Sequence, residues 1–294
     1  MCRKMIVLNE KTFAEDCIKN GKKIDGNPFQ ILAIMAKYYY HTLGYRKKKI
    51  VENLTEFLEE NYPRYQSNKT SWDESIDKIS RNAGRYPLYE IDGVWITKQE
   101  LDLISTLNDD KLERIAFTYL CLAKLHNARN PSANGWVNEE MNEIYELARV
   151  TCNRFQKNVY IGMLHDAGLL EFPKRLDNLS CRVTFINEDG ESVLFVSDFR
   201  ELGYEYEKFK GHDYIRCSEC GILMKNNRAK NKRYCDKCAG YQSIGTKTVT
   251  CVDCGKEFEV DARVSNKHRC DNCQSIVNRE KKRLWKQLHS QMVE

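Results

Sequence analysis

Apolar residues recur at helical spacing through the first third of the chain. The pattern predicts one short strand followed by four helices, over residues 4–8, 10–20, 28–43, 46–60 and 71–83. The second helix is expected to bury a stripe of Phe29, Leu32, Met35, Ala36 and Tyr39. Ser71 and Glu74 have the spacing of a capping box, which would open the fourth helix. Asp92-Gly93, between two apolar runs, then predicts a β-hairpin over residues 88–96.

The middle third alternates between helical and extended patterns. Thr97 and Glu100 form a second capping-box sequence, which predicts a short helix. Three longer helices are expected over residues 109–126, 138–148 and 152–167, and the first of them is apolar on most sides. Gly168 ends the last helix, and alternating strands follow over residues 169–172, 181–186 and 193–196.

Residues 97–186 resemble the winged-helix family of DNA-binding domains. The residues that carry the resemblance are the short turn at 149–151 and the run Met163-Leu-His-Asp-Ala-Gly-Leu-Leu170 before the two strands. The resemblance implies a recognition helix followed by a β-wing. Because similar layouts also serve as protein-docking domains, it does not by itself fix the partner.

The helical phase of residues 152–167 separates two arcs. We expect the buried arc to hold Cys152, Phe155, Val159, Tyr160, Met163 and Leu164. If the other arc enters a major groove, Arg154 and Asn158 can read base edges, Lys157 can contact phosphate and Ile161 can meet a thymine methyl. Lys174 and Arg175 of the wing would hold the neighbouring DNA backbone. The alternative is an ordinary solvated helix face.

Eight cysteines in the last third form two modules of the type C-x2-C…C-x2-C. The ligand sets are Cys217, Cys220, Cys235 and Cys238 in the first module, and Cys251, Cys254, Cys270 and Cys273 in the second. Each pair can grip one Zn²⁺ from a tight turn, and two pairs complete a closed tetrahedron. The sequence therefore predicts two structural zinc ions, with His212 and His268 as non-ligands.

The two modules are also similar to each other, at an offset of 34 residues. Gly221 and Gly255 follow the second cysteine of each, where a left-handed backbone is easiest for glycine. The pattern over residues 212–274 resembles the zinc-ribbon class, whose members commonly bind nucleic acid or protein. Disulfides, an iron–sulfur cluster and a thioredoxin-like redox pair are the alternatives. A reducing compartment disfavours disulfides, the repeated paired spacing fits zinc better than a cluster, and no βαβ pattern surrounds either motif.

Positive charge is concentrated in the last third. Residues 211–294 hold 17 Lys and Arg against 10 Asp and Glu, whereas residues 1–210 hold 30 against 32. Two four-thiolate zinc centres would lower the local excess to about +3. The candidate nucleic-acid contacts of this region are Lys225, Arg228, Lys230, Lys232 and Arg233 in a loop, and Arg279, Lys282, Arg283 and Lys286 on a helix over 275–290.

The sequence thus predicts a mainly α protein with small β elements. Its expected parts are a helical module with a hairpin (1–96), a winged helix-turn-helix domain (97–210), two zinc ribbons (211–240 and 241–274) and a basic amphipathic helix (275–294). No signal peptide or membrane-length apolar run is found, so a soluble protein of the reducing bacterial cytoplasm, with no membrane partner, is expected.

The function expected from these parts is non-enzymatic nucleic-acid binding. DNA is the first partner, RNA the second, and the role would be regulation of transcription or replication. P-loop, H-E-x-x-H and G-x-S-x-G sequences are absent, and the paired histidines and asparagine of HNH nucleases are missing around 217–273. The alternative is a protein-binding adaptor or inhibitor that docks on a polymerase or a host defence nuclease. The chain as a whole resembles uncharacterised proteins of phages and mobile elements in Gram-positive bacteria, a likeness that implies no residue roles.

Overall fold

The computed structural model describes residues 5–21, 28–62, 64–173, 180–226, 232–240, 246–261 and 266–290. The chain divides into two compact units. The first unit comprises Met1–Ile215 and Ile222–Arg228, and the second comprises Arg216–Gly221 and Ala229–Glu294. The described part is mainly helical with small antiparallel sheets, as the sequence predicts. None of its helices has the length and apolarity of a bilayer-spanning segment.

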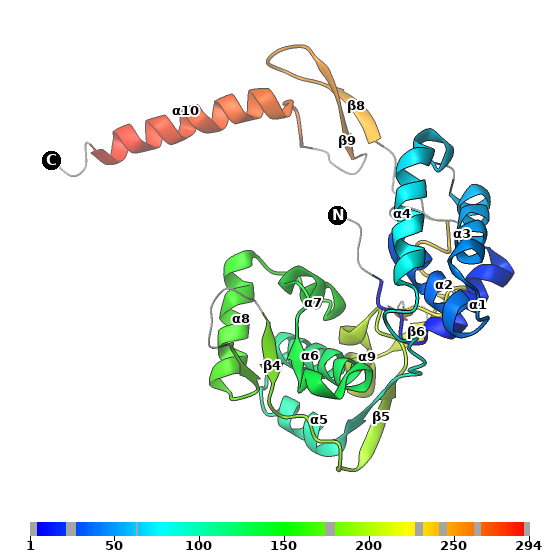
Figure 1. Ribbon diagram of the computed structural model, residues 1–294. Helices are drawn as coiled ribbons and strands as arrows, with labels where there is room; N and C mark the ends of the chain where they lie inside the picture. Colours follow the sequence, from blue (N-terminus) through cyan, green and yellow to red (C-terminus); the bar gives the residue numbers. More distant parts are fainter. Residues whose placement is uncertain are drawn as a thin grey trace. The chain divides into compact units, whose positions relative to one another are not determined.

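Four helices and a short 3-10 turn build the first core of the larger unit (Figure 1). They are α1 (Glu10–Asn20), α2 (Phe29–His41), α3 (Lys47–Asn61), η1 (Gln66–Asn68) and α4 (Lys69–Asn82). The expected stripe of α2 is buried except for Phe29, which is 41% exposed. The predicted capping box at Ser71 is wrong, because α4 already begins at Lys69 and Ser71 lies inside the helix. A side-chain cap is present on α1, where Asn9 accepts a hydrogen bond from the Thr12 backbone N–H.

The second core surrounds α6 (Asp110–Arg129), whose thirteen buried residues explain its nearly all-round apolar pattern. Asp109 caps this helix by accepting from the backbone N–H groups of Lys111 and Leu112, at 2.8 and 2.9 Å. The helices packed around it are α5 (Lys98–Ser105), α7 (Met141–Leu147), α8 (Arg154–Asp166) and α9 (Leu202–Phe209), and η2 (Pro131–Ala133) follows it. The capping box at Thr97 that opens α5 is confirmed.

A small three-stranded sheet is built from one strand before the α7–α8 pair and two strands after it. Its strands are β2 (Trp136–Val137), β3 (Leu170–Glu171) and β4 (Cys181–Val183), in the order β2-β4-β3. Gly168, at φ 74°, turns the chain out of α8 into β3. The predicted wing contacts Lys174 and Arg175 lie outside the described residues.

The hairpin predicted over residues 88–96 is wrong. Strand β1 (Val94–Thr97) pairs antiparallel with β5 (Ser192–Val196), and Glu90 forms an isolated bridge with Asn9. Val94 and Ile96 are buried in the second core, so the strand is held by that core rather than by the segment before the Asp92-Gly93 turn. The strand predicted over residues 4–8 is also wrong in its described part, because residues 5–8 belong to no strand.

The phase predicted for α8 is wrong in part. Leu164 is buried and Cys152 and Tyr160 pack against the second core, as predicted. Ile161, expected to face a DNA groove, is 5% exposed, whereas Phe155 is 75% exposed. The physical reason is that α8 packs on the second core through Ile161 and Leu164, and the Tyr145 hydroxyl donates to the Lys157 carbonyl at 2.8 Å. With this packing, three residues that were expected to be buried are exposed to solvent: Phe155, Val159 and Met163.

The remaining strands form two separate two-stranded sheets. One pairs β6 (Tyr214–Arg216) with β7 (Leu223–Lys225), and the other pairs β8 (Thr246–Thr250) with β9 (Glu257–Asp261). The final helix, α10, spans Asp271–Ser290 and starts four residues earlier than predicted (Figure 1).

Candidate metal centres

The first cysteine pair of each module lies in the turn between two antiparallel strands. Cys217 and Cys220 follow β6, and Cys251 and Cys254 follow β8. Their turns have the same hydrogen bond, in which the glycine N–H after the pair donates to the carbonyl of the first cysteine at 2.9 Å. Gly221 and Gly255 adopt φ values of 68° and 69°, so the left-handed conformation expected from the sequence is confirmed.

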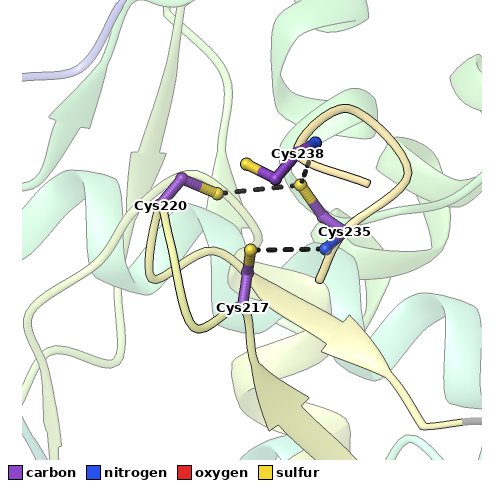
Figure 2. A group of neighbouring side chains, drawn as sticks. All are labelled: Cys217, Cys220, Cys235 and Cys238. Atoms are coloured by element: carbon purple, nitrogen blue, oxygen red, sulfur yellow. Dashed lines mark hydrogen bonds between the residues drawn. The ribbon is translucent and has the colours of Figure 1, made fainter. Parts of the chain in front are cut away.

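Four sulfurs of the first module face one another across a small space (Figure 2). All of the Sγ atoms of Cys217, Cys220, Cys235 and Cys238 lie within 4.8 Å of one another. The Sγ atoms of Cys220 and Cys235 are 3.7 Å apart. Zn–S bonds of about 2.3 Å separate the corners of a regular tetrahedron by about 3.8 Å, so this distance is the one that a zinc ion requires.

The second module has the same geometry. Cys251, Cys254, Cys270 and Cys273 also lie within 4.8 Å, and the Sγ atoms of Cys254 and Cys270 are 3.8 Å apart. Among the described residues, no other group of metal-ligating side chains meets this geometry. Each group of four thiolates can hold one zinc ion, which makes two ions for the chain. With four protein ligands, neither site keeps an open position for substrate.

Backbone N–H groups support the sulfurs in equivalent places. The N–H of Cys235 donates to the Cys217 sulfur at 3.3 Å, and the N–H of Cys270 donates to the Cys251 sulfur at 3.4 Å. One further bond in each module ties the turn to the residues before its second cysteine pair. In the first module Ser218 N–H donates to the Arg233 carbonyl at 2.9 Å, and in the second Val252 N–H donates to the His268 carbonyl at 3.0 Å. The internal repeat read from the sequence is therefore a repeat of backbone hydrogen bonds.

These N–H donors favour thiolate at the most buried sulfur of each module. The pKa of Cys217 is lowered to about 6, chiefly by hydrogen bonding from the backbone of Cys220. The pKa of Cys251 is also lowered to about 6, chiefly by the backbone of Cys270. Both side chains are nearly inaccessible, at 3% and 2% exposure.

The last cysteine of each module responds in the opposite direction. Hydrogen bonding to the Cys235 side chain raises the pKa of Cys238, and hydrogen bonding to the Cys270 side chain raises the pKa of Cys273. Four sulfurs this close repel as anions, so they cannot all ionise unless a cation compensates their charge. The donor set therefore fits a doubly charged, thiolate-seeking ion such as Zn²⁺.

The other described cysteines take no part in these groups. Cys17, Cys121 and Cys181 are buried in the two cores of the larger unit, and Cys152 is half-buried. Burial raises the pKa of the Cys121 thiol well above its usual value, so it remains a protonated packing group. His212 and His268 belong to neither metal group, as predicted.

The basic side chains predicted to contact nucleic acid lie in three separate segments. On α8, Arg154 and Asn158 are exposed, but Lys157 is half-buried and its Nζ lies 2.7 Å from Asn142 Oδ1. In the first module Lys225 and Arg233 are exposed. Lys232 is half-buried and pairs with Asp236 at 3.2 Å, while Arg228 and Lys230 lie outside the described residues.

Helix α10 begins inside the second metal group. Its first turn contains Asp271 and the ligand Cys273, and the Gln274 N–H donates to the Cys270 carbonyl at 2.9 Å. Arg279, Lys282 and Arg283 are exposed on one side of the helix at spacings of three and four residues. Lys286 continues this row in the sequence, although its side chain lies outside the described part. A bound ion would therefore fix the start of the basic helix.

No protein-family model, curated protein or solved structure matches this chain.

Two features are not predicted by the sequence. The first is the set of sulfur-bonding N–H groups, which leave no residue-type signal because any residue except proline supplies one. The second is the exposed apolar face of α8, which the sequence pattern predicts to be buried. The spacing of four between Phe155, Val159 and Met163 does signal a shared helix face, but spacing alone does not say whether protein or solvent covers it.

Proposed function

We propose that this chain is a non-enzymatic, zinc-dependent nucleic-acid-binding protein whose principal contacts with DNA come from its cysteine-rich unit. The observation that carries the proposal is the basic row of α10, which starts within one turn of a metal ligand. A helix anchored in this way presents its cations without the entropy cost of ordering a free tail.

The electrostatics of α10 suit a phosphate backbone. The exposed Arg279, Lys282 and Arg283 can each neutralise one phosphate and release condensed counterions. Exposed Arg233 adds a cation in the first module. Contacts with phosphate give affinity and orient the protein on the duplex, but they do not give sequence specificity. We therefore assign this unit the backbone-binding part of a regulator of transcription or replication. The cytoplasm of a bacterial host, where thiols stay reduced, is the compartment that fits two thiolate centres.

We do not assign base reading to α8. Its outward face is dominated by Phe155, Val159 and Met163, and the one well-exposed cation among its predicted contacts is Arg154. Major-groove recognition depends on polar and cationic side chains that match base edges. An apolar stripe in that place favours contact with protein.

The experiment is a fluorescence-anisotropy titration of a labelled DNA duplex at two or more salt concentrations. The affinity of the wild-type protein should fall steeply as salt is added. For three phosphate contacts, the logarithm of the association constant should fall by about three for each tenfold rise in salt concentration. The triple variant Arg279→Glu, Lys282→Glu, Arg283→Glu should lose most of this binding. A control with the same charge change, Lys47→Glu, Lys48→Glu, Lys49→Glu on exposed positions of α3, should bind as wild type. Salt-independent binding, or equal loss in both variants, contradicts the proposal.

A second candidate function, a protein-binding adaptor or inhibitor, is favoured by a different surface. Trp95 of β1 and Phe195 of β5 are 55% and 41% exposed, and their rings lie 4.9 Å apart on the outer side of a two-stranded sheet. Paired exposed aromatics are typical of protein interfaces. A partner such as a polymerase or a defence nuclease would co-purify in fixed ratio after nuclease treatment and would be lost from a Trp95→Ser, Phe195→Ser variant.

A further inference from the structure

A cavity of about 210 Å³ lies where the two cores of the larger unit meet. Its walls come from segment 5–7, from α2, from the end of α6, and from α7 with the residues before it. Sites for small molecules are common where two packed bodies adjoin, and pockets for drug-sized ligands measure about 300–1,000 Å³. A ligand that fits this cavity is therefore a small metabolite.

Four of the titratable side chains in the wall are partners of one another. Lys37 of α2 forms an ion pair with Glu10 of α1. His126 Nε2 of α6 lies 2.9 Å from Glu139 Oε1, in the segment before α7. These pairs leave two charged side chains of the wall, one of each sign, to interact with a ligand.

The positive one is Arg129, at the end of α6. Its Nη2 donates to the Val7 carbonyl at 2.6 Å, and its guanidinium lies over the Tyr89 ring at 5.2 Å from the centroid, so its position is fixed. Its Nε atom is buried and has no acceptor among the described residues. A buried donor without an acceptor is rare in folded proteins, and at the wall of a cavity it indicates a ligand that accepts.

The negative one is Glu143, on α7. It is half-buried, and within the described part of the chain neither it nor Arg129 forms an ion pair. A carboxylate that is partly withdrawn from water gains from a cationic partner, as the guanidinium gains from an anionic one. The cavity thus offers one uncompensated charge of each sign.

We propose that this cavity binds a free aliphatic amino acid. The ligand carboxylate accepts a hydrogen bond from Arg129 Nε, and the ligand ammonium pairs with Glu143. The hydrocarbon part contacts the aliphatic wall, which includes Ile34, Leu125 and Leu147. A simple anion would leave Glu143 uncompensated and a simple cation would leave Arg129 so, which is why the site selects a zwitterion. The proposal goes beyond nucleic-acid binding and does not depend on it.

Segment 5–7 is connected to two walls of the cavity. The Met5 N–H donates to Gln30 Oε1 of α2 at 3.1 Å, and the Val7 carbonyl accepts from Arg129 of α6. A ligand held by Arg129 therefore also stabilises the contact between this segment and α6. Bound ligand should slow the amide hydrogen exchange of residues 5–7 and 125–129 more than that of α3, which does not line the cavity.

Isothermal titration calorimetry of the full zinc-loaded chain with free leucine, isoleucine, valine and methionine, one at a time, tests the proposal. At least one should bind with a dissociation constant of about 10 µM to 1 mM, as expected for so small a ligand. Two analogues of that amino acid separate its charges: the carboxylic acid that lacks the amino group, and the amine that lacks the carboxyl group. Each should bind at least about tenfold more weakly, since one charged hydrogen bond is lost.

The neutral isostere Glu143→Gln assigns the ammonium contact. It should weaken binding of the amino acid by at least about tenfold and should not weaken binding of the carboxylic acid. Glu146→Gln, at an exposed position of the same helix outside the cavity, is the matched control and should bind as wild type. If Glu143→Gln fails to fold, the analogues tested on wild-type protein decide the question.

Three results overturn the proposal. The first is that none of the four amino acids binds at about 10 mM, well above the expected range. The second is that the carboxylic acid or the amine binds as tightly as the amino acid itself. The third is that folded Glu143→Gln and Glu146→Gln bind the amino acid equally well.

Discussion

Lys124 and Glu100 form an ion pair that is almost completely withdrawn from solvent. The Nζ atom of Lys124 lies 2.8 Å from Glu100 Oε1, and the two side chains are 9% and 0% exposed. Lys124 also donates to the Trp95 carbonyl at 2.8 Å. Glu100 accepts from the backbone N–H of Thr97 and of Asn187, both at 2.7 Å. One carboxylate therefore links α5, α6, β1 and the chain before β5.

Removing the cation alone should destabilise this core strongly. In Lys124→Met the Glu100 charge stays buried without its partner, and we expect the free energy of unfolding to fall by about 3–5 kcal/mol. Urea denaturation measures the change. Lys49→Met, which breaks an exposed pair with Glu52 at 3.4 Å, serves as the control and should change stability by less than about 1 kcal/mol. Equal effects of the two variants would contradict the assignment of a buried pair.

The two metal groups should lose their ions independently. Cys220→Ser removes one ligand of the first group and should lower the zinc content from two ions per chain to one, and Cys254→Ser should do the same for the second group. Cys152→Ser, at a half-buried cysteine outside both groups, should retain two ions. Elemental analysis of the purified variants gives the ratios. Loss of both ions from either ligand variant would refute independent sites.

Acid should release zinc. Binding requires thiolates, and the raised pKa values of Cys238 and Cys273 mean that the ion must displace their protons, whereas Cys217 and Cys251, with pKa values of about 6, are largely ionised at neutral pH. The affinity for zinc therefore rises with pH. It is lost as pH falls through about 6, where the thiolates of Cys217 and Cys251 become protonated. Competition with a chromophoric chelator between pH 8 and pH 6 should show a loss of more than about tenfold per pH unit, since more than one proton is displaced. An affinity independent of pH would argue against thiolate ligation.

The glycine after each first cysteine pair should resist substitution by branched residues. Gly255 adopts φ 69°, and an added Cβ would meet no other atom within 4 Å, so any cost comes from the backbone conformation rather than from a clash. Gly255→Val should destabilise the second module by about 1–2 kcal/mol, and Gly255→Asn by less, because asparagine tolerates the left-handed region. Zinc retention during stepwise chelation measures the difference. Identical behaviour of the two variants would show that the turn relaxes.

Local patterns predicted the metal ligands and most helices of this chain. Cysteine spacing defines a metal group because two residues between ligands fix the turn by themselves, and the Thr97 box specifies its helix within four residues. The partner of β1 was beyond such reasoning, because Val94 pairs with Val196, a residue from a distant part of the chain that follows the other elements of the second core in sequence. The outward side of α8 was not predictable either. Apolar residues lie on both arcs of this helix, and only the packing of Ile161 and Leu164 on the second core determines which arc is buried.

The measurement that bears most directly on the account is zinc stoichiometry combined with chelation of the intact protein. We predict two zinc ions per chain. Their removal should make amide hydrogens of the described second-unit segments, among them 246–261 and 266–283, exchange rapidly, while those of α6 stay protected. A preparation without zinc, whose second unit is nevertheless protected with or without chelator, would contradict the metal centres and the binding function that rests on them.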